Sequence, residues 1–285
     1  MIGRRLLAAA AAVALIVVLA GGAPRPEIAL DANAAIVAAE RDTLEAIDRL
    51  EAQLAPALDA ARTGAAQVVA GEADPAGALA AAADGLVAAA PSATELGDAL
   101  AELERARAAL RPEAERLPPA PDAGHLESIA SQLASTAEAG ATFAEIRRGA
   151  ESVSGSVIDA LDAAAAGRLD DADEHLTMSL EAVEAVRELE EGALVLSVWI
   201  DTADAMIRAV QELVDAVRTS DPGRADAARA DFDAAAEHAP QADRSLRIGL
   251  GETGSAISAV PLRRLAEVHV ALRDLEAAVR AEVGG

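Results

Sequence analysis

Apolar residues recur every three or four positions along most of the chain, which is the spacing of one face of an α-helix. The first such pattern runs from Ile28 towards Gly71. Pro56 lies within it and predicts that this helix kinks there but does not end. The clearest pattern begins near Leu126 and predicts a helix of about 40 residues, about 60 Å long. Runs of β-favouring residues are nearly absent, so the pattern predicts an all-α protein.

Proline, glycine and capping residues predict where the helices begin and end. The pairs Asp74-Pro75 and Asp221-Pro222 each place a capping carboxylate before a proline, so each predicts the start of a short helix. Ser92 directly follows a proline and has Glu95 three residues after it, so this pair predicts the start of another helix with a capping box. The glycine-rich residues 249–254 predict a flexible joint between two helices.

The middle of the chain predicts a tight turn at Gly167, followed by another long helix. Its apolar stripe extends from Leu176 to Val217 and predicts a helix that reaches Ser220, with a bend at Gly192 as the alternative. Short turns between long helices place neighbouring helices antiparallel. The predicted fold is therefore an elongated antiparallel bundle of long, Ala-rich helices with coiled-coil-like packing.

After residue 23, the strongest interruption of the helical pattern is the proline-rich segment at residues 117–122, with the sequence LPPAPD. It predicts an N-terminal helical half at residues 24–120 and a C-terminal helical half at residues 121–285. One continuous bundle formed by both halves is the alternative.

The first 23 residues have the pattern of a secretory signal peptide. Arg4 and Arg5 precede the uninterrupted apolar residues 6–20, and glycines and a proline follow. The uncharged residues 6–23 are also long enough to span a bilayer, which takes about 17–25 residues, so an uncleaved membrane anchor is the alternative. In both cases the rest of the chain is expected to be extracytoplasmic, either secreted or anchored at the cell envelope, and residues 1–23 are its only expected membrane contact.

The charge balance narrows the range of partners. With 48 acidic and 24 basic residues the formal net charge is −24, so the surface repels phosphate backbones and nucleic-acid binding is not expected. The chain has no Cys, which excludes disulfides and a thiol nucleophile. It has one Trp and two Phe, so platforms for base or sugar stacking are missing.

Leu96, Leu103, Leu110 and Leu117 recur every seven residues and form a candidate partner face. The hypothesis is that this face binds a protein partner or a second copy of the chain. The alternative is an ordinary bundle helix, because Pro112 interrupts the repeat.

Motifs for catalysis or metal binding do not meet their structural requirements. Residues 249–254 match G-x-G-x-x-G, but no strand precedes them and Glu252 would lie beside the phosphates. The acidic residues from Asp170 to Glu174, with His175, are better explained as favourable charges at a helix N-terminus. No His has a Glu three residues before it, as di-iron bundles require. We therefore expect no catalytic, cofactor or metal site.

Trp199, with Met206, Asp201 and Asp204 nearby, is the most ligand-like set of residues. The indole ring of Trp199 could line the bottom of a pocket in which a carboxylate binds a cationic ligand. The alternative is that Trp199 belongs to the core and that Asp204 pairs with Arg208 at the surface. The expected function is a non-catalytic interaction, scaffold or sensing module, with a ligand-binding domain near Trp199 as the second hypothesis. A third hypothesis is an enzyme whose site is assembled from distant helices.

Overall fold

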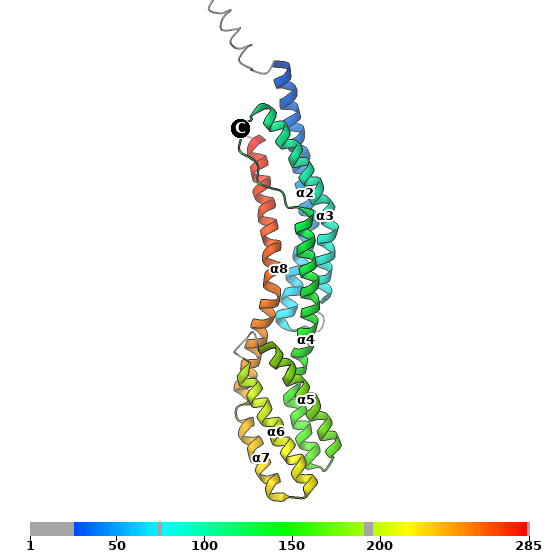
Figure 1. The fold of residues 1–285 in the computed structure, drawn as a ribbon, viewed down its shortest axis with the longest axis vertical. Helices are drawn as coiled ribbons and strands as arrows, with labels where there is room; N and C mark the ends of the chain where they lie inside the picture. The colour runs from blue at the N-terminus through cyan, green and yellow to red at the C-terminus, as the bar shows by residue number, and fades with distance from the viewer. Residues whose placement is uncertain (1–25, 73–75, 191–195, 284–285) are drawn as a thin grey trace, which may run out of the picture. The chain divides into compact units, whose positions relative to one another are not determined.

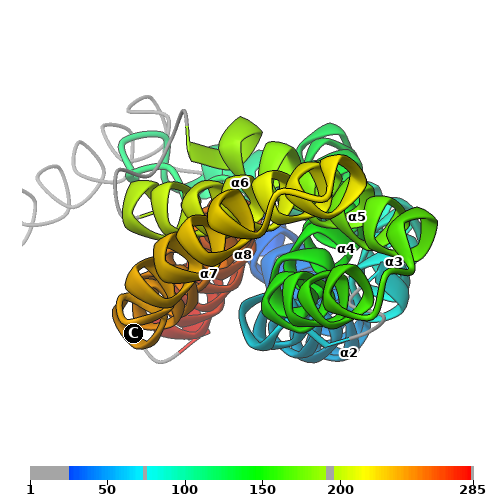
Figure 2. The same cartoon turned by 90° about the horizontal axis from the view of Figure 1, so that it is seen from below.

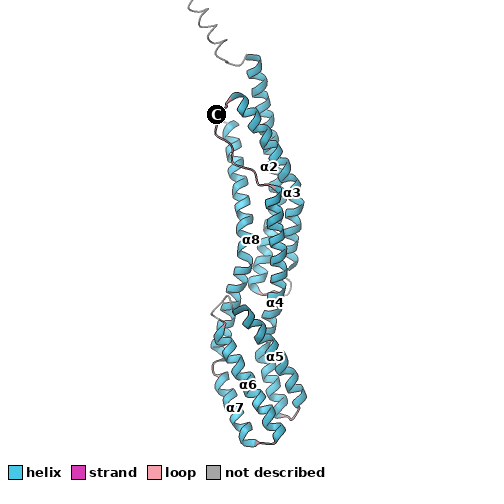
Figure 3. Cartoon of the chain, viewed as in Figure 1, coloured by secondary structure: helices cyan, strands magenta, loops and turns pink. Residues whose placement is uncertain are grey.

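The computed structural model describes residues 26–72, 76–190 and 196–283, and most of these residues are helical and none forms a strand (Figures 1 and 3). The helices pack against one another, which confirms the predicted all-α fold. Their bounds are Pro26–Ala70 for α2, Ala76–Leu110 for α3, Ala123–Ala165 for α4, Leu169–Glu190 for α5, Ser197–Thr219 for α6, Pro222–Ala236 for α7 and Ala239–Val283 for α8. The predicted signal segment, residues 1–23, lies outside the described residues.

Two long helices follow the apolar pattern closely. Helix α4 has 43 residues and buries Leu126, Ile129, Leu133 and Phe143 on one face, which confirms the predicted helix. Helix α2 has 45 residues and continues through Pro56. Proline removes one N–H from the hydrogen-bond ladder, and the burial of residues on both sides of it holds the rest of the helix together.

The predicted helix start at Ser92 is wrong. Helix α3 continues from Ala76 to Leu110 with Pro91 inside it, and Ser92 is 8% exposed in the helix interior. Leu86 and Leu96, on either side of the proline, are both fully buried. Their packing outweighs the loss of one hydrogen bond, since burying a leucine side chain contributes about 1.5–3 kcal/mol. Asp74-Pro75, the other predicted helix start in this region, lies outside the described residues.

The predicted joint at residues 249–254 is also wrong, because these residues lie inside the continuous helix α8. A Cβ atom added at Gly249 would lie 2.5 Å from Cδ2 of Leu196. One added at Gly254 would lie 3.2 Å from the carbonyl oxygen of Val68. These two glycines therefore let neighbouring backbone and side chains approach α8 closely, and the motif has a packing role.

The expected long helix after Gly167 is two helices, α5 and α6, and Gly192 lies outside the described residues. Gly167 has the predicted turn geometry, with a φ of +78° that favours glycine. The capping prediction at Asp221 is confirmed, because its Oδ1 accepts a hydrogen bond from the backbone N–H of Arg224 at 3.1 Å.

The chain forms two compact units. Unit 1 comprises Met1–Ala52, Ala90–Ala123 and His269–Gly285, and unit 2 comprises Gln53–Ala89 and Gly124–Val268. Both units contain residues from each side of the proline-rich segment, so they do not coincide with the two predicted halves of the sequence.

In unit 1, a buried arginine fastens the segment that follows α3. Arg107 is 4% exposed, and its guanidinium donates to Glu104 at 3.3 Å and to the carbonyl oxygen of Glu115 at 3.2 Å. Oε1 of Glu104 also accepts from the backbone N–H of Leu117 at 2.6 Å. Hydrogen bonds thus hold this irregular segment against the end of α3.

In unit 2, α6 packs against both α5 and α7 (Figure 2). Helix α5 also approaches α4 closely, because a Cβ added at Gly149 would lie 3.4 Å from that of Ala182. Helix α2 ends at Ala70 and is followed by Gly71, with a φ of +70°, and Arg147 of α4 donates to the carbonyl oxygen of Val69 at 3.0 Å. The turn at Gly71 and the hydrogen bond from Arg147 thereby supply donors to backbone carbonyl groups that have no helical partner at the end of α2.

Of the described helices, α3 alone has the length and composition to cross a membrane. Its most apolar 18-residue window has a mean hydropathy of 1.3, and 44% of that window is buried within the folded chain. Packed core helices have the same properties, so this finding carries no further conclusion about a membrane.

Candidate functional site

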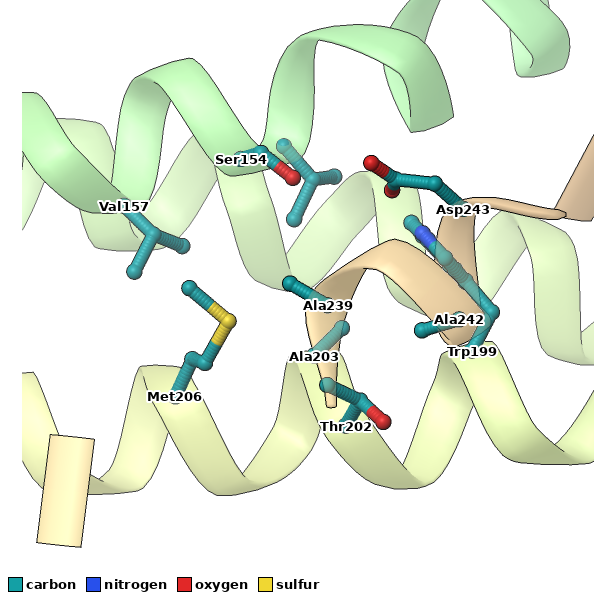
Figure 4. Close-up of a pocket in the computed structure, with 10 residues that line it drawn as sticks. Ser154, Val157, Trp199, Thr202, Ala203, Met206, Ala239, Ala242 and Asp243 are labelled. Atoms are coloured by element: carbon teal, nitrogen blue, oxygen red, sulfur yellow. The ribbon is translucent and has the colours of Figure 1, made fainter. Parts of the chain in front are cut away.

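Trp199 lies beside a small cavity in unit 2, between α4, α6 and α8 (Figure 4). We call it the Trp199 cavity. Its walls are formed by Val153, Ser154 and Val157 of α4, by Trp199, Thr202, Ala203 and Met206 of α6, and by Ala239, Ala242 and Asp243 of α8. The structure therefore brings Trp199 and Met206 together, as the sequence predicts for a pocket.

The Trp199 cavity is nearly filled by its own side chains. Its volume is about 10 Å³, the space of about one water molecule. Trp199 is 3% exposed and Met206 is 6% exposed. A metabolite cannot enter this space unless side chains move, so this conformation favours the interpretation of Trp199 as a core residue.

The acidic residues predicted for this pocket do not line it. Asp201 is exposed on α6. Asp204 accepts a hydrogen bond from Arg187 of α5 at 2.8 Å, and its Oδ2 lies 3.8 Å from Arg208. The predicted pairing of Asp204 with Arg208 is thus present, within a small ion-pair cluster on the surface.

Asp243 is the carboxylate that does line the Trp199 cavity, and sequence reasoning missed it. It lies on α8, far from Trp199 in the chain, and nothing in the local sequence relates the two residues. Thr202 adds a hydroxyl to the wall, but that hydroxyl donates to the carbonyl oxygen of Val198 at 2.8 Å. Whether Trp199, Asp201, Asp204 and Met206 bind a ligand stays a prediction.

The four leucines of the candidate partner face do not form an exposed stripe. Leu96 and Leu103 are 0% exposed, so a partner cannot reach them in the folded chain. Leu110 is the last residue of α3, and Leu117 lies beyond the helix end, and both are half-buried. These positions favour the alternative interpretation, in which the leucines belong to the bundle core.

The acidic residues at the start of α5 pair with arginines. Asp171 accepts a hydrogen bond from Arg168 at 3.0 Å, and Asp173 accepts one from Arg218 of α6. The hydrogen bond to Asp173 raises the pKa of Arg218 above its usual value. Within the described residues no group of three or more His, Asp or Glu side chains is arranged to hold a metal ion.

A second hollow lies between α4 and α8 in unit 2, and we call it the α4–α8 groove. Its volume is about 270 Å³. One wall consists of Ser131, Gln132, Ser135 and Thr136, and the other of Ile257, Val260 and Pro261. Sequence reasoning did not find this groove, because small hydroxyl residues on a helix normally indicate a solvated face.

No protein-family model, curated protein or solved structure matches this chain. Its functional assignment therefore depends on its own residues and geometry.

Proposed function

We propose that this chain is exported and acts at the cell envelope as a non-catalytic helical module, which contacts a protein partner or a second copy of itself through outward helix faces. Export rests on the signal-peptide pattern of residues 1–23. The interaction role rests on ion pairs between the charged side chains of neighbouring helices.

The observation that carries the proposal is a series of ion pairs that connect successive helices of unit 2. Arg187 of α5 pairs with Asp204 of α6, and Arg218 of α6 pairs with Asp173 of α5. Arg224 of α7 pairs with Glu212 of α6, which raises the pKa of Arg224. Such exposed pairs stabilise a fold by about 0–1 kcal/mol each, so their main consequence is to define the register of neighbouring helices. A bundle with a defined register presents its outer faces in a constant arrangement.

A contact with a partner must use residues that remain outside the core. On α5, Met178 is 54% exposed and Leu180 is 42% exposed. Exposed aliphatic side chains on a helix with defined neighbours are suitable anchors for a partner helix. Val183 of the same helix is 1% exposed and cannot take part.

Site-specific photo-crosslinking tests this proposal in the cells that produce the chain. A photo-reactive amino acid at position 178 or at position 180, which lie on different flanks of α5, is expected to crosslink a protein partner, or a second copy of the chain, outside the cytoplasm. The same group at the buried position 183 is the control and should give no such product. A chain that stays in the cytoplasm with residues 1–23 intact would contradict export. Absence of a discrete product from every exposed helix position would contradict the interaction role.

A further inference from the structure

We propose that the α4–α8 groove binds a small uncharged molecule that carries an N–H or O–H donor beside a short aliphatic segment. This inference is independent of the protein contact proposed above, because it concerns different helices and a different kind of partner.

The polar wall of the groove contains an acceptor without a donor. The side-chain oxygen of Gln132, Oε1, is buried and has no hydrogen-bond partner among the described residues. A buried amide group without a partner is energetically costly, so turning this oxygen towards a ligand donor in the groove would relieve that cost. Rotation about the terminal side-chain bond of glutamine is broad, and it can turn the amide towards the groove.

Two hydroxyls beside Gln132 can complete the polar wall. Ser131 and Ser135 lie four residues apart on α4, and both are exposed to solvent. They can accept from a ligand or donate to its carbonyl oxygen. The hydroxyl of Thr136 is occupied, because it donates to the backbone oxygen of Gln132 at 2.7 Å.

The opposite wall is aliphatic, and a proline interrupts the helical hydrogen-bond ladder beside it. Pro261 lies inside α8 and has no N–H, so the carbonyl of Ile257, four residues earlier, lacks its usual helical donor. Ile257 itself is half-buried and Val260 is 46% exposed. A ligand can therefore lay its methylene groups on these side chains.

The charge and size of the groove define the ligand class. None of its seven lining residues ionises, although 25% of the chain is charged. No lining side chain can act as a counter-ion for a charged ligand, which favours an uncharged one. The volume of about 270 Å³ holds many water molecules, and it lies just below the range of about 300–1,000 Å³ for small-molecule sites.

Butanamide is a suitable probe, because it joins an amide donor and acceptor to a propyl group. We would titrate it into the isotope-labelled full chain and record the backbone and side-chain amide signals by NMR. The expected result is a saturable shift of the Gln132 side-chain amide and of the backbone amides of residues 131–136, 257–260 and 262. The chain has five Gln residues, which makes the Gln132 signal assignable by single substitution.

Two pairs of variants test the site with matched controls. Val260→Arg should abolish the saturable shifts, whereas Val270→Arg, at another exposed valine of α8, should leave them unchanged. Gln132→Met should weaken binding at least several-fold, whereas Gln67→Met should not. Gln67 is a valid control because its Oε1 is also buried without a partner, but it does not line the groove.

Three results would overturn the proposal: shifts that do not saturate, equal affinities in Val260→Arg and Val270→Arg, or shifts spread evenly over the surface. The exposed position of Val260 ensures that this test does not depend on a variant that fails to fold. None of these results bears on the photo-crosslinking experiment, so the two proposals can fail separately.

Discussion

The Trp199 cavity and the α4–α8 groove lie in the same compact unit, and α4 and α8 contribute walls to both. The first has a volume of about 10 Å³ and the second about 270 Å³. The difference follows from side-chain size, because Trp199 and Met206 fill the first space while serines and a threonine leave the second open. In this protein, which is nearly without aromatic residues, the single Trp identifies a packed region rather than an empty one.

The largest expected effect is at the filled region. Trp199→Ala should lower the free energy of unfolding by about 3–5 kcal/mol, because it removes a buried ring and leaves a cavity. Urea unfolding followed by circular dichroism measures this change. Ser135→Ala, at the exposed wall of the groove, is the control and should stay within about 0.5 kcal/mol. A loss below about 1 kcal/mol for Trp199→Ala would mean that the indole does not hold the core together.

An intermediate effect is expected in the stretch of α8 between the two regions. Gly254→Ala should destabilise the protein by about 1–2 kcal/mol, since its Cβ would lie 3.2 Å from the oxygen of Val68 and 3.3 Å from Cε1 of Phe143. Gly251→Ala meets nothing within 4 Å and should stabilise the helix by up to about 1 kcal/mol. Thermal unfolding of both variants checks the opposite signs. Equal changes in the two variants would show that close packing at Gly254 is not important.

The smallest effect is expected at the surface beside Trp199. Asp204→Asn breaks the pair with Arg187 and should cost at most about 1 kcal/mol, an effect that decreases as salt is added. Asp201→Asn, on the exposed side of the same helix, should change stability by less than about 0.5 kcal/mol. Unfolding at low and high ionic strength separates the two. A larger loss for Asp201→Asn would indicate that this carboxylate has a partner role that its exposure does not reveal.

The helix pattern could be predicted where one strong apolar face decided the structure. Helix α4 and the Asp221 cap followed directly from local spacing and chemistry. The continuity of α3 through Pro91 and of α8 through residues 249–254 could not be predicted in the same way. Proline and glycine weaken a helix locally. These helices continue because they pack against neighbouring helices, and the local sequence does not show that packing.

The candidate site was only partly predictable. Trp199 and Met206 lie together because they are seven residues apart on one helix, a distance that two helical turns determine. Asp243 and the α4–α8 groove depend on residues from separate helices, so no local pattern could identify them. The leucine repeat predicted a partner face, but Leu96 and Leu103 are buried in the folded chain and Leu117 lies beyond the helix, which local spacing could not indicate.

The amino-acid sequence by itself determined that the chain is helical, acidic and free of disulfides. These properties depend only on which residues are present and on the spacing of the apolar ones along the chain. Tertiary structure decided which leucines are buried, which glycines are close contacts and which hollow stays open. The physical reason is that burial and cavity size depend on side chains from several helices, and their positions are set by packing across the bundle.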